Sequence, residues 1–288
     1  MNILITGCNG QLGREMQALS RAMEAHTCFY TDVDELDICK LDLIENFVQN
    51  KQINCIVNCA AYTSVDKAET DLAKAYLLNE FAVENLAKVA AKYNAYLIHI
   101  STDYVFSGEG FLPWTEENKT CPVGVYGKSK LAGEDAVRKY ANKAIIIRTS
   151  WLYSAFGNNF VKTMLRLGKE KTELSVVFDQ VGTPTYAKDL ARTILCIIGQ
   201  LQAHSKGVEL YHYSNEGVCS WYDFANEIMK LAKLNCKVKP IESKDYPTPT
   251  KRPAYSVLNK NKIKRTFNIS IPHWTESLQM LLQTDPLI

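Results

Sequence analysis

The stretch "NILITGCNGQLGREM", residues 2–16, decides the fold. Its first five residues form an apolar run typical of a buried strand, and a helical pattern follows within a few residues. Apolar residues there recur at spacings of three and four: Leu12, Met16, Leu19 and Met23. Three glycines lie between the two patterns: Gly7, Gly10 and Gly13. The stretch therefore predicts a strand, a glycine turn and a helix in direct succession.

This glycine turn has the spacing GxxGxxG and not the GxGxxG of the common dinucleotide fingerprint. Its physical consequences are similar, because glycine lets the backbone turn sharply and approach a pyrophosphate closely. The N-terminus of the following helix offers unpaired N–H groups and the positive end of the helix dipole. We therefore expect a nucleotide site here. The alternative is a turn in which the glycines only cap the helix.

Apolar strands alternate with helical patterns through the first half of the chain. Strands are expected at residues 27–33, 54–62, 96–106 and 143–153, and helices at residues 71–93 and 126–140. Near-continuous apolar strands of this kind predict a parallel sheet that helices cover on both faces. Together with the glycine turn, they predict an α/β fold built on a Rossmann-type, doubly wound parallel sheet.

The pattern loosens after about Tyr153. Helices are expected at residues 158–170, 189–200 and 221–234, strands at 174–180 and 208–215, and a proline-rich loop at 244–253. We expect residues 1–152 and 186–214 to form the nucleotide-binding domain. Residues 153–185 and 215–288 would form a smaller C-terminal substrate domain.

Composition excludes several classes of protein. Among 288 residues the net charge is only +2, so no basic field favours nucleic acid as a partner. The apolar run before Gly7 is too short for a signal peptide, and no run of about 18 apolar residues indicates a membrane span. The nine cysteines contain no CxxC pair, and unpaired thiols suit a reducing compartment. A soluble, cytoplasmic protein is expected.

An acidic residue follows the second expected strand. Asp32 stands where a carboxylate can accept hydrogen bonds from the hydroxyl groups of an adenosine ribose. Because a carboxylate would repel a ribose 2′-phosphate, Asp32 favours NADH over NADPH, with NADPH possible. The alternative is that Asp32, one of several acids in "DVDELD", only caps a turn.

Three polar residues form a candidate catalytic group. Thr102 lies at the end of the fourth expected strand, where open parallel sheets bind their ligands. Tyr126 and Lys130 are four residues apart, so they share one face of a helix. An ammonium near a phenol favours the phenolate and lowers the pKa of the tyrosine from its usual value of about 10. This arrangement is typical of a tuned proton donor.

Several segments together resemble a known family. They are "GCNGQLG", "NCAAYTSVDKAE", "STDYVFSG", "YGKSKLAGE", "RTSWLY", "DQVGTPT" and "KRPAYSVLN". In this set the chain resembles the dTDP-4-dehydrorhamnose reductases of the extended short-chain dehydrogenase/reductase superfamily, over nearly its whole length. The resemblance implies reduction of a C4 keto group of a dTDP-sugar by NAD(P)H.

The resemblance also implies roles for particular residues. Tyr126 would donate a proton to the C4 oxygen, Lys130 would hold the nicotinamide ribose, and Thr102 would hydrogen-bond the carbonyl. The cofactor would contact a set drawn from the glycine turn, the second and third strands and the catalytic helix: Gly7, Gly10, Gln11, Leu12, Gly13, Asp32, Asp37, Ile38, Ala60, Ala61, Tyr62, Tyr126 and Lys130.

The dTDP-sugar would contact Thr102 and three further residues: Asp103, Trp151 and Arg252. A guanidinium suits a diphosphate, which is the reason for choosing Arg252. For Trp151 the alternative is an ordinary core position, and for Arg252 a solvated basic loop. His99, inside an apolar strand, is interpreted as a core residue.

One departure from the family pattern concerns metal. Some members of the family hold magnesium at a dimer contact through carboxylates, and Glu15 matches one such ligand. Lys188 in "PTYAKDL" stands where another acid would be expected. We therefore expect no required metal, and either a monomer or a homodimer.

Two other functions remain open at this point. A nucleotide-sugar epimerase or dehydratase of the same superfamily would recycle its NAD, but dehydratases need an acid/base pair where this chain has Asp103 and Tyr104. A non-catalytic subunit, like the regulatory subunit of methionine adenosyltransferase, would share the fold. The presence of Thr102, Tyr126 and Lys130 together favours catalysis.

Overall fold

A six-stranded parallel sheet forms the centre of the protein. The computed structural model describes residues 1–21, 26–204 and 207–284. The strand order is β10-β5-β4-β3-β1-β2, and every neighbouring pair is parallel. The strands are β1 (Asn2–Thr6), β2 (Thr27–Thr31), β3 (Cys55–Asn58), β4 (Tyr96–Thr102), β5 (Lys143–Thr149) and β10 (Gly207–His212). The order reverses between β1 and β3, so the sheet has a switch point there, where such folds bind ligands.

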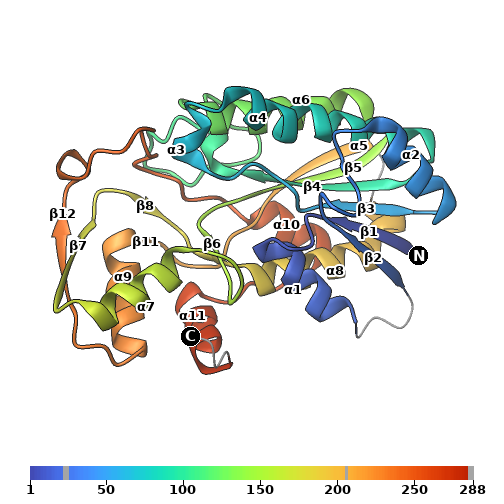
Figure 1. Cartoon of the computed structure of the whole chain (residues 1–288). Coiled ribbons are helices and arrows are strands. Elements are labelled where there is room, and N and C mark those ends of the chain that lie inside the picture. Colours follow the sequence, from blue (N-terminus) through green and yellow to red (C-terminus); the bar gives the residue numbers. More distant parts are fainter. Residues whose placement is uncertain (22–25, 205–206, 285–288) are drawn as a thin grey trace.

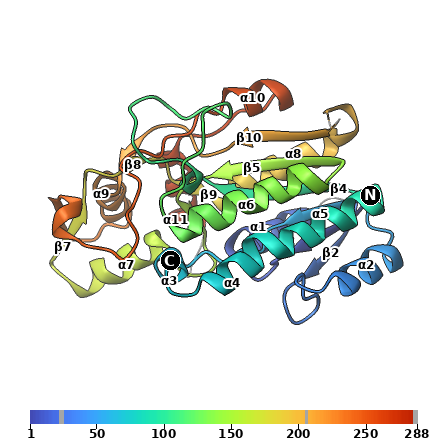
Figure 2. The ribbon, with the colours of Figure 1, turned by 90° about the horizontal axis from the view of Figure 1, so that it is seen from above.

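Helices cover both faces of this sheet, as Figures 1 and 2 show. One face carries α1 (Gln11–Ser20), α8 (Ala187–His204) and α10 (Asn261–Phe267). The other carries α2 (Leu41–Asn50), α4 (Leu72–Tyr76), α5 (Ala82–Lys92) and α6 (Val125–Tyr140). The short helices α3 (Val65–Ala68) and η2 (Asp103–Val105) follow the carboxyl ends of β3 and β4.

The alternation of side chains along each strand explains the two covered faces. Ile3 and Ile5 of β1 belong to the cluster on the α1 and α8 face, whereas Leu4 belongs to the cluster under α5. A strand buried on both sides must be apolar at nearly every position, which is what the sequence shows. The predicted α/β fold with a Rossmann-type parallel sheet is confirmed.

A third apolar cluster organises the smaller part of the protein, at the left of Figure 1. It is built around Phe224 of α9 (Trp221–Leu231), with α7 (Phe160–Glu170) and α11 (Trp274–Thr284) packed beside it. Short strand pairs border it: β7 (Glu173–Val177) with β12 (Lys237–Ile241), β8 (Val181–Gly182) with β11 (Cys219–Ser220), and β6 (Leu152–Tyr153) with β9 (Thr185–Tyr186). The division into two domains remains a prediction, since α10 packs on the core of the large sheet through Ile263 and Phe267.

Several details differ from the sequence-based expectations. The expected helix at residues 71–93 contains a π-helical turn, η1 (Leu77–Phe81), between α4 and α5. Helices α2, α10 and α11 and the short strands β11 and β12 were not expected. The proline-rich loop at 244–253 begins with a short 3₁₀ turn, η3 (Ser243–Asp245). Met23 lies outside the described residues.

Within the described ranges, no helix is long and apolar enough to cross a membrane.

Candidate functional site

The glycine turn packs directly against the end of β3. Gly7 has a φ of +64°, a conformation that favours glycine, and a Cβ at this position would lie 2.6 Å from the backbone nitrogen of Ala60. A Cβ at Gly13 would lie 2.2 Å from the carbonyl oxygen of Gly7. Gly7 therefore requires glycine for conformation and packing, and Gly13, inside α1, requires it for packing. Gly10 is the N-cap of α1, and it has no side chain with which to cap the first N–H groups of the helix.

Asp32 closes the opposite side of this turn. One of its carboxylate oxygens accepts a hydrogen bond from the backbone N–H of Asn9 at 3.0 Å, and the other accepts one from Val33 at 2.9 Å. The carboxylate therefore links the end of β2 to the glycine turn. It lies just after β2, where the sequence predicts a carboxylate that binds a ribose.

A cavity of about 590 Å³ opens between these elements, at the carboxyl ends of β1, β2 and β3. Its walls are mostly apolar, with Asp32 and Asp37 among the lining residues. The lining consists of Thr6, Gly7, Gly10, Asp32, Val33, Leu36, Asp37, Ile38, Cys39, Cys59, Ala60, Ala61, Lys74, Leu77 and Leu78. An apolar slot with carboxylates and a helix N-terminus fits the adenosine and pyrophosphate of a dinucleotide.

Seven of the residues predicted to bind a cofactor line this cavity: Gly7, Gly10, Asp32, Asp37, Ile38, Ala60 and Ala61. Four others from that prediction serve the surrounding structure. Leu12 is buried in the core, Gly13 packs beneath Gly7, and the side-chain oxygen of Gln11 accepts a hydrogen bond from Asn159 at 3.0 Å. Tyr62 is buried with its backbone N–H bonded to the side chain of Asn79 at 2.9 Å.

The candidate catalytic residues gather at the carboxyl end of β4. The Thr102 hydroxyl donates to the Asp103 carboxylate at 2.9 Å. The ammonium of Lys130, whose side chain is 2% exposed, donates to the Ile100 carbonyl at 2.6 Å. Burial lowers the pKa of Lys130 to about 8, and the carboxylate of Glu134 opposes this shift.

The electrostatics of Tyr126 differ from the expectation. Burial of its hydroxyl raises the pKa of Tyr126 above the usual value, and a hydrogen bond with Thr102 opposes that rise. In the free protein the pKa of Tyr126 is not lowered by a nearby ammonium as expected, because desolvation of the hydroxyl has the larger effect. Tyr126 is therefore protonated at neutral pH, the state that a proton donor needs. Its ring meets that of Tyr104 edge-on, with 5.4 Å between ring centroids.

Asp103 is also buried, with 3% of its surface exposed. Burial raises the pKa of Asp103 to about 7, although the hydrogen bond from Thr102 stabilises the carboxylate. A carboxyl group beside Thr102 and Tyr126 can therefore exist in either protonation state near neutral pH.

The remaining two residues predicted to bind the sugar nucleotide are Trp151 and Arg252. Trp151 has a φ of +47° and stacks on Trp221, with ring centroids 3.6 Å apart. Arg252 forms an ion pair with Asp66, which belongs to α3. In this structure the guanidinium thus already has an acidic partner, although Arg252 also lies close enough to Tyr104 to influence its pKa.

The possible metal ligands are separately engaged. Glu15 is buried and accepts a hydrogen bond from Ser154 at 2.8 Å, while Asp189, next to Lys188, accepts one from Ser277. Within residues 1–21, 26–204 and 207–284, no three His, Cys, Asp or Glu side chains gather as a metal site.

Two buried polar residues were missed by the sequence analysis. Asn79 in the π-helical turn bonds both the backbone of Tyr62 and the Ser129 hydroxyl, which joins the cavity wall to α6. Glu134 lies one helical turn after Lys130 and is fully buried. The repeated spacing of four from Tyr126 to Lys130 to Glu134 could have revealed it.

Comparisons with known proteins agree with this geometry. The chain matches the family described as "RmlD substrate binding domain" over residues 1–286. It is 40% identical to the spore coat polysaccharide biosynthesis protein SpsK of Bacillus subtilis (strain 168), over 98% of this chain and 96% of that protein.

Two solved structures named dTDP-4-dehydrorhamnose reductase have the same fold throughout. The one from Clostridium acetobutylicum ATCC 824 superposes with a TM-score of 0.93 at 44% identity, covering 98% of this chain and 99% of the other. The one from Bacillus anthracis str. Ames, in complex with NADP, has a TM-score of 0.93 at 39% identity and covers 99% of both chains. The chain therefore belongs to the RmlD substrate binding domain family.

Proposed function

We propose that this protein reduces the C4 keto group of dTDP-4-dehydro-L-rhamnose to give dTDP-L-rhamnose, with NADH or NADPH as the reductant. The observation that carries the proposal is the meeting of Thr102, Tyr126 and Lys130 at the end of β4, in a sheet whose switch point holds the dinucleotide cavity. The relatives' names support the same substrate. The reaction would be the final step of dTDP-rhamnose synthesis for cell-surface polysaccharide.

Each catalytic residue would have one task. Tyr126, protonated in the free protein, would donate its proton to the oxygen that develops negative charge at C4. Thr102 would turn its hydroxyl from Asp103 to that same oxygen. Lys130, one turn after Tyr126 on the same helix, would hold the nicotinamide ribose. A bound nicotinamide would supply the hydride.

The cofactor would bind from the glycine turn to the catalytic helix. Gly10, Gln11 and Leu12 would contact the pyrophosphate, with the backbone N–H groups of Gln11 and Leu12 as donors, and Gly7 and Gly13 shape that turn. A further set would line the adenosine and the path to the nicotinamide: Asp32, Asp37, Ile38, Ala60, Ala61 and Tyr62.

Asp32 supports a preference for NADH. Its carboxylate would accept hydrogen bonds from the ribose hydroxyls and repel a 2′-phosphate. The relative from Bacillus anthracis was solved with NADP, so the use of both cofactors by this protein is the alternative.

The sugar nucleotide would lie between the end of β4 and the smaller part of the protein. Asp103 and Trp151 would contact the sugar, and Arg252 would bind the diphosphate. Because Arg252 is paired with Asp66 in the free protein, diphosphate binding would have to compete with that carboxylate. We also propose a cytoplasmic enzyme, since all nine cysteines are free thiols, and a monomer or homodimer without a required metal.

The test is consumption of NADH, and separately of NADPH, with dTDP-4-dehydro-L-rhamnose, followed by absorbance. We expect one equivalent of cofactor to be oxidised per sugar, and Tyr126→Phe to lower kcat by at least about a hundredfold while NADH still binds. Tyr153→Phe is the matched control, because Tyr153 is a buried tyrosine in the third apolar cluster, the one built around Phe224.

The alternatives predict different results. An epimerase or dehydratase would convert a sugar nucleotide without net oxidation of NADH. A regulatory subunit would bind dinucleotide and a partner enzyme without turnover of any sugar nucleotide. Either result would reject the proposed reduction.

A further inference from the structure

Two consecutive residues of β4, Ile100 and Ser101, hold two successive turns of α6. The Ile100 carbonyl accepts the Lys130 ammonium at 2.6 Å. The Ser101 hydroxyl donates to the Glu134 carboxylate at 2.6 Å. Thr102, the next residue of the strand, lies close enough to Tyr126 to lower the pKa of the tyrosine. The strand therefore fixes the two turns of the catalytic helix that carry Lys130 and Glu134.

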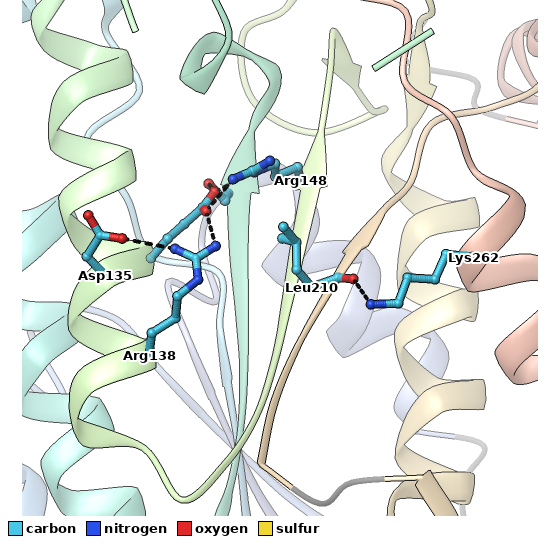
Figure 3. Close-up of polar contacts among 7 residues, drawn as sticks. Asp135, Arg138, Arg148, Leu210 and Lys262 are labelled. Atoms are coloured by element: carbon cyan, nitrogen blue, oxygen red, sulfur yellow. Dashed lines mark hydrogen bonds and ion pairs between the residues drawn. The ribbon is translucent and has the colours of Figure 1, made fainter. Parts of the chain in front are cut away.

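The Glu134 carboxylate is the centre of a buried ion network. It accepts two hydrogen bonds from the Arg148 guanidinium, at 2.8 Å from Nε and 2.7 Å from Nη2, and a third from Arg138 at 2.8 Å. Arg148 projects from β5, directly beside Ser101 in the sheet. Figure 3 shows Arg138 and Arg148 reaching toward each other from the helix and the strand. A single carboxylate thus ties α6 to both β4 and β5.

Stability alone does not account for this network. Glu134 is fully buried and Arg148 is 2% exposed. Removing two charges from water costs several kcal/mol per ion, and an apolar pair of similar volume is often as stable. What the ion pair adds is geometry, since the two parallel hydrogen bonds of a guanidinium fix both partners in one orientation.

The surroundings of Lys130 give this geometry a chemical consequence. Burial and the nearby Lys130 ammonium lower the pKa of His99 of β4, which keeps the imidazole neutral. Tyr126 on the same helix is protonated, Asp103 of η2 has a pKa of about 7, and Asn79 of η1 is neutral. Among the described residues, the Glu134 carboxylate is the group that raises the pKa of Lys130 against the lowering by burial.

We propose that Glu134, held by Arg148 and Ser101, is a positioning residue for Lys130: it fixes the turn of α6 that carries the lysine and keeps the ammonium charged in a buried site. This inference rests on the proposed function, because it assigns Lys130 to the cofactor. It predicts that loss of the carboxylate impairs turnover most strongly at alkaline pH. A bond that only supports the fold would not change the pH profile.

The experiment compares Glu134→Gln with Asp135→Asn. The control removes a negative charge from the next residue of the same helix, where the carboxylate is 67% exposed and bonds Arg138. For Glu134→Gln we expect the alkaline limb of the kcat/KM profile to move about one pH unit toward acid. Asp135→Asn should keep the wild-type profile.

Two further measurements make the result independent of folding and of turnover. The double variant Glu134→Gln/Arg148→Met removes both members of the ion pair, so no guanidinium is left buried without its carboxylate, and the protein should melt close to the wild type and still show the displaced limb. In parallel, NMR of ¹³Cε-labelled lysine, with Lys130→Met for assignment, would titrate Lys130 directly. Its midpoint should fall in Glu134→Gln and not in Asp135→Asn.

The outcomes separate the two hypotheses. Wild-type turnover with unchanged profiles and an unchanged Lys130 midpoint in the variants would overturn the positioning role alone. If the wild type oxidises no cofactor, the proposed function fails, and the Lys130 titration still decides whether Glu134 keeps the ammonium charged. If neither Glu134→Gln nor Glu134→Gln/Arg148→Met folds, the Glu134–Arg148 ion pair is required for folding, and this result would also overturn the proposal.

Discussion

Replacement of Gly13 by alanine should damage both the fold and nucleotide binding. The added Cβ would lie 2.2 Å from the Gly7 carbonyl oxygen and 2.6 Å from the Cys8 Cα. Both neighbours are backbone atoms, so neither can move away by changing rotamer. Overpacking of this kind costs about 1–3 kcal/mol, and contact with backbone places Gly13→Ala at the upper end. For a chain of this size the melting temperature should fall by roughly 5–10 °C.

The matched control is Gly199→Ala in α8. Among the described residues nothing lies within 4 Å of a Cβ at Gly199, which is in the interior of the helix. Alanine there should stabilise the protein by about 0.5–1 kcal/mol. Thermal melting measures stability, and quenching or enhancement of NADH fluorescence measures binding. If Gly13→Ala melted and bound NADH as the wild type does, the close packing of α1 against the backbone of Gly7 and Cys8 would be wrong.

Three further variants test individual residues. Asp32→Ser removes the negative charge beside the ribose position, so the ratio of kcat/KM for NADPH over NADH should rise about tenfold or more, and an unchanged ratio would remove Asp32 from the cofactor site. The folded protein holds the pKa of Asp103 at about 7, above the 3.8 of an unperturbed aspartate, so wild-type stability should decline as pH rises from about 4 to about 7. Asp103→Asn lacks this loss, and its stability relative to wild type should grow by up to about 4 kcal/mol between pH 3 and pH 8 in urea unfolding; a constant difference would refute the buried carboxyl. Tyr153→Phe removes a buried hydroxyl that has no hydrogen-bond partner among the described residues, so it should leave the melting temperature unchanged or raise it, and a loss of more than about 1 kcal/mol would indicate a partner.

The sequence predicts the sheet well because each strand is buried on both faces. The centres of runs such as "NILIT" and "KAIIIRT" are apolar at consecutive positions, as a parallel sheet covered on both sides requires. The glycine turn is equally predictable, since Gly7 and Gly13 are places where a side chain would collide with backbone. In these regions local pattern and tertiary packing point to the same structure.

Prediction fails where a residue's role depends on distant partners. Arg252 was assigned to a diphosphate from its chemistry, but no local pattern shows that Asp66, far away in the chain, would pair with it. The pKa of Tyr126 was expected to fall from the spacing to Lys130, yet burial, which spacing does not reveal, has the larger effect. The spacing of four places Glu134 on the same helix face as Lys130, but it does not show the contacts with Arg148 and Ser101 that bury it.

The most direct test of the account follows a deuterium atom from the cofactor to the sugar. The protein would be incubated with dTDP-4-dehydro-L-rhamnose and NADH deuterated at nicotinamide C4 on the transferred face, and the product would be examined by NMR. The proposed reduction predicts one deuterium at C4 of the sugar for each NADH consumed, and almost none with Tyr126→Phe. A product without deuterium at C4, or conversion of the sugar without consumption of NADH, would contradict the proposed function.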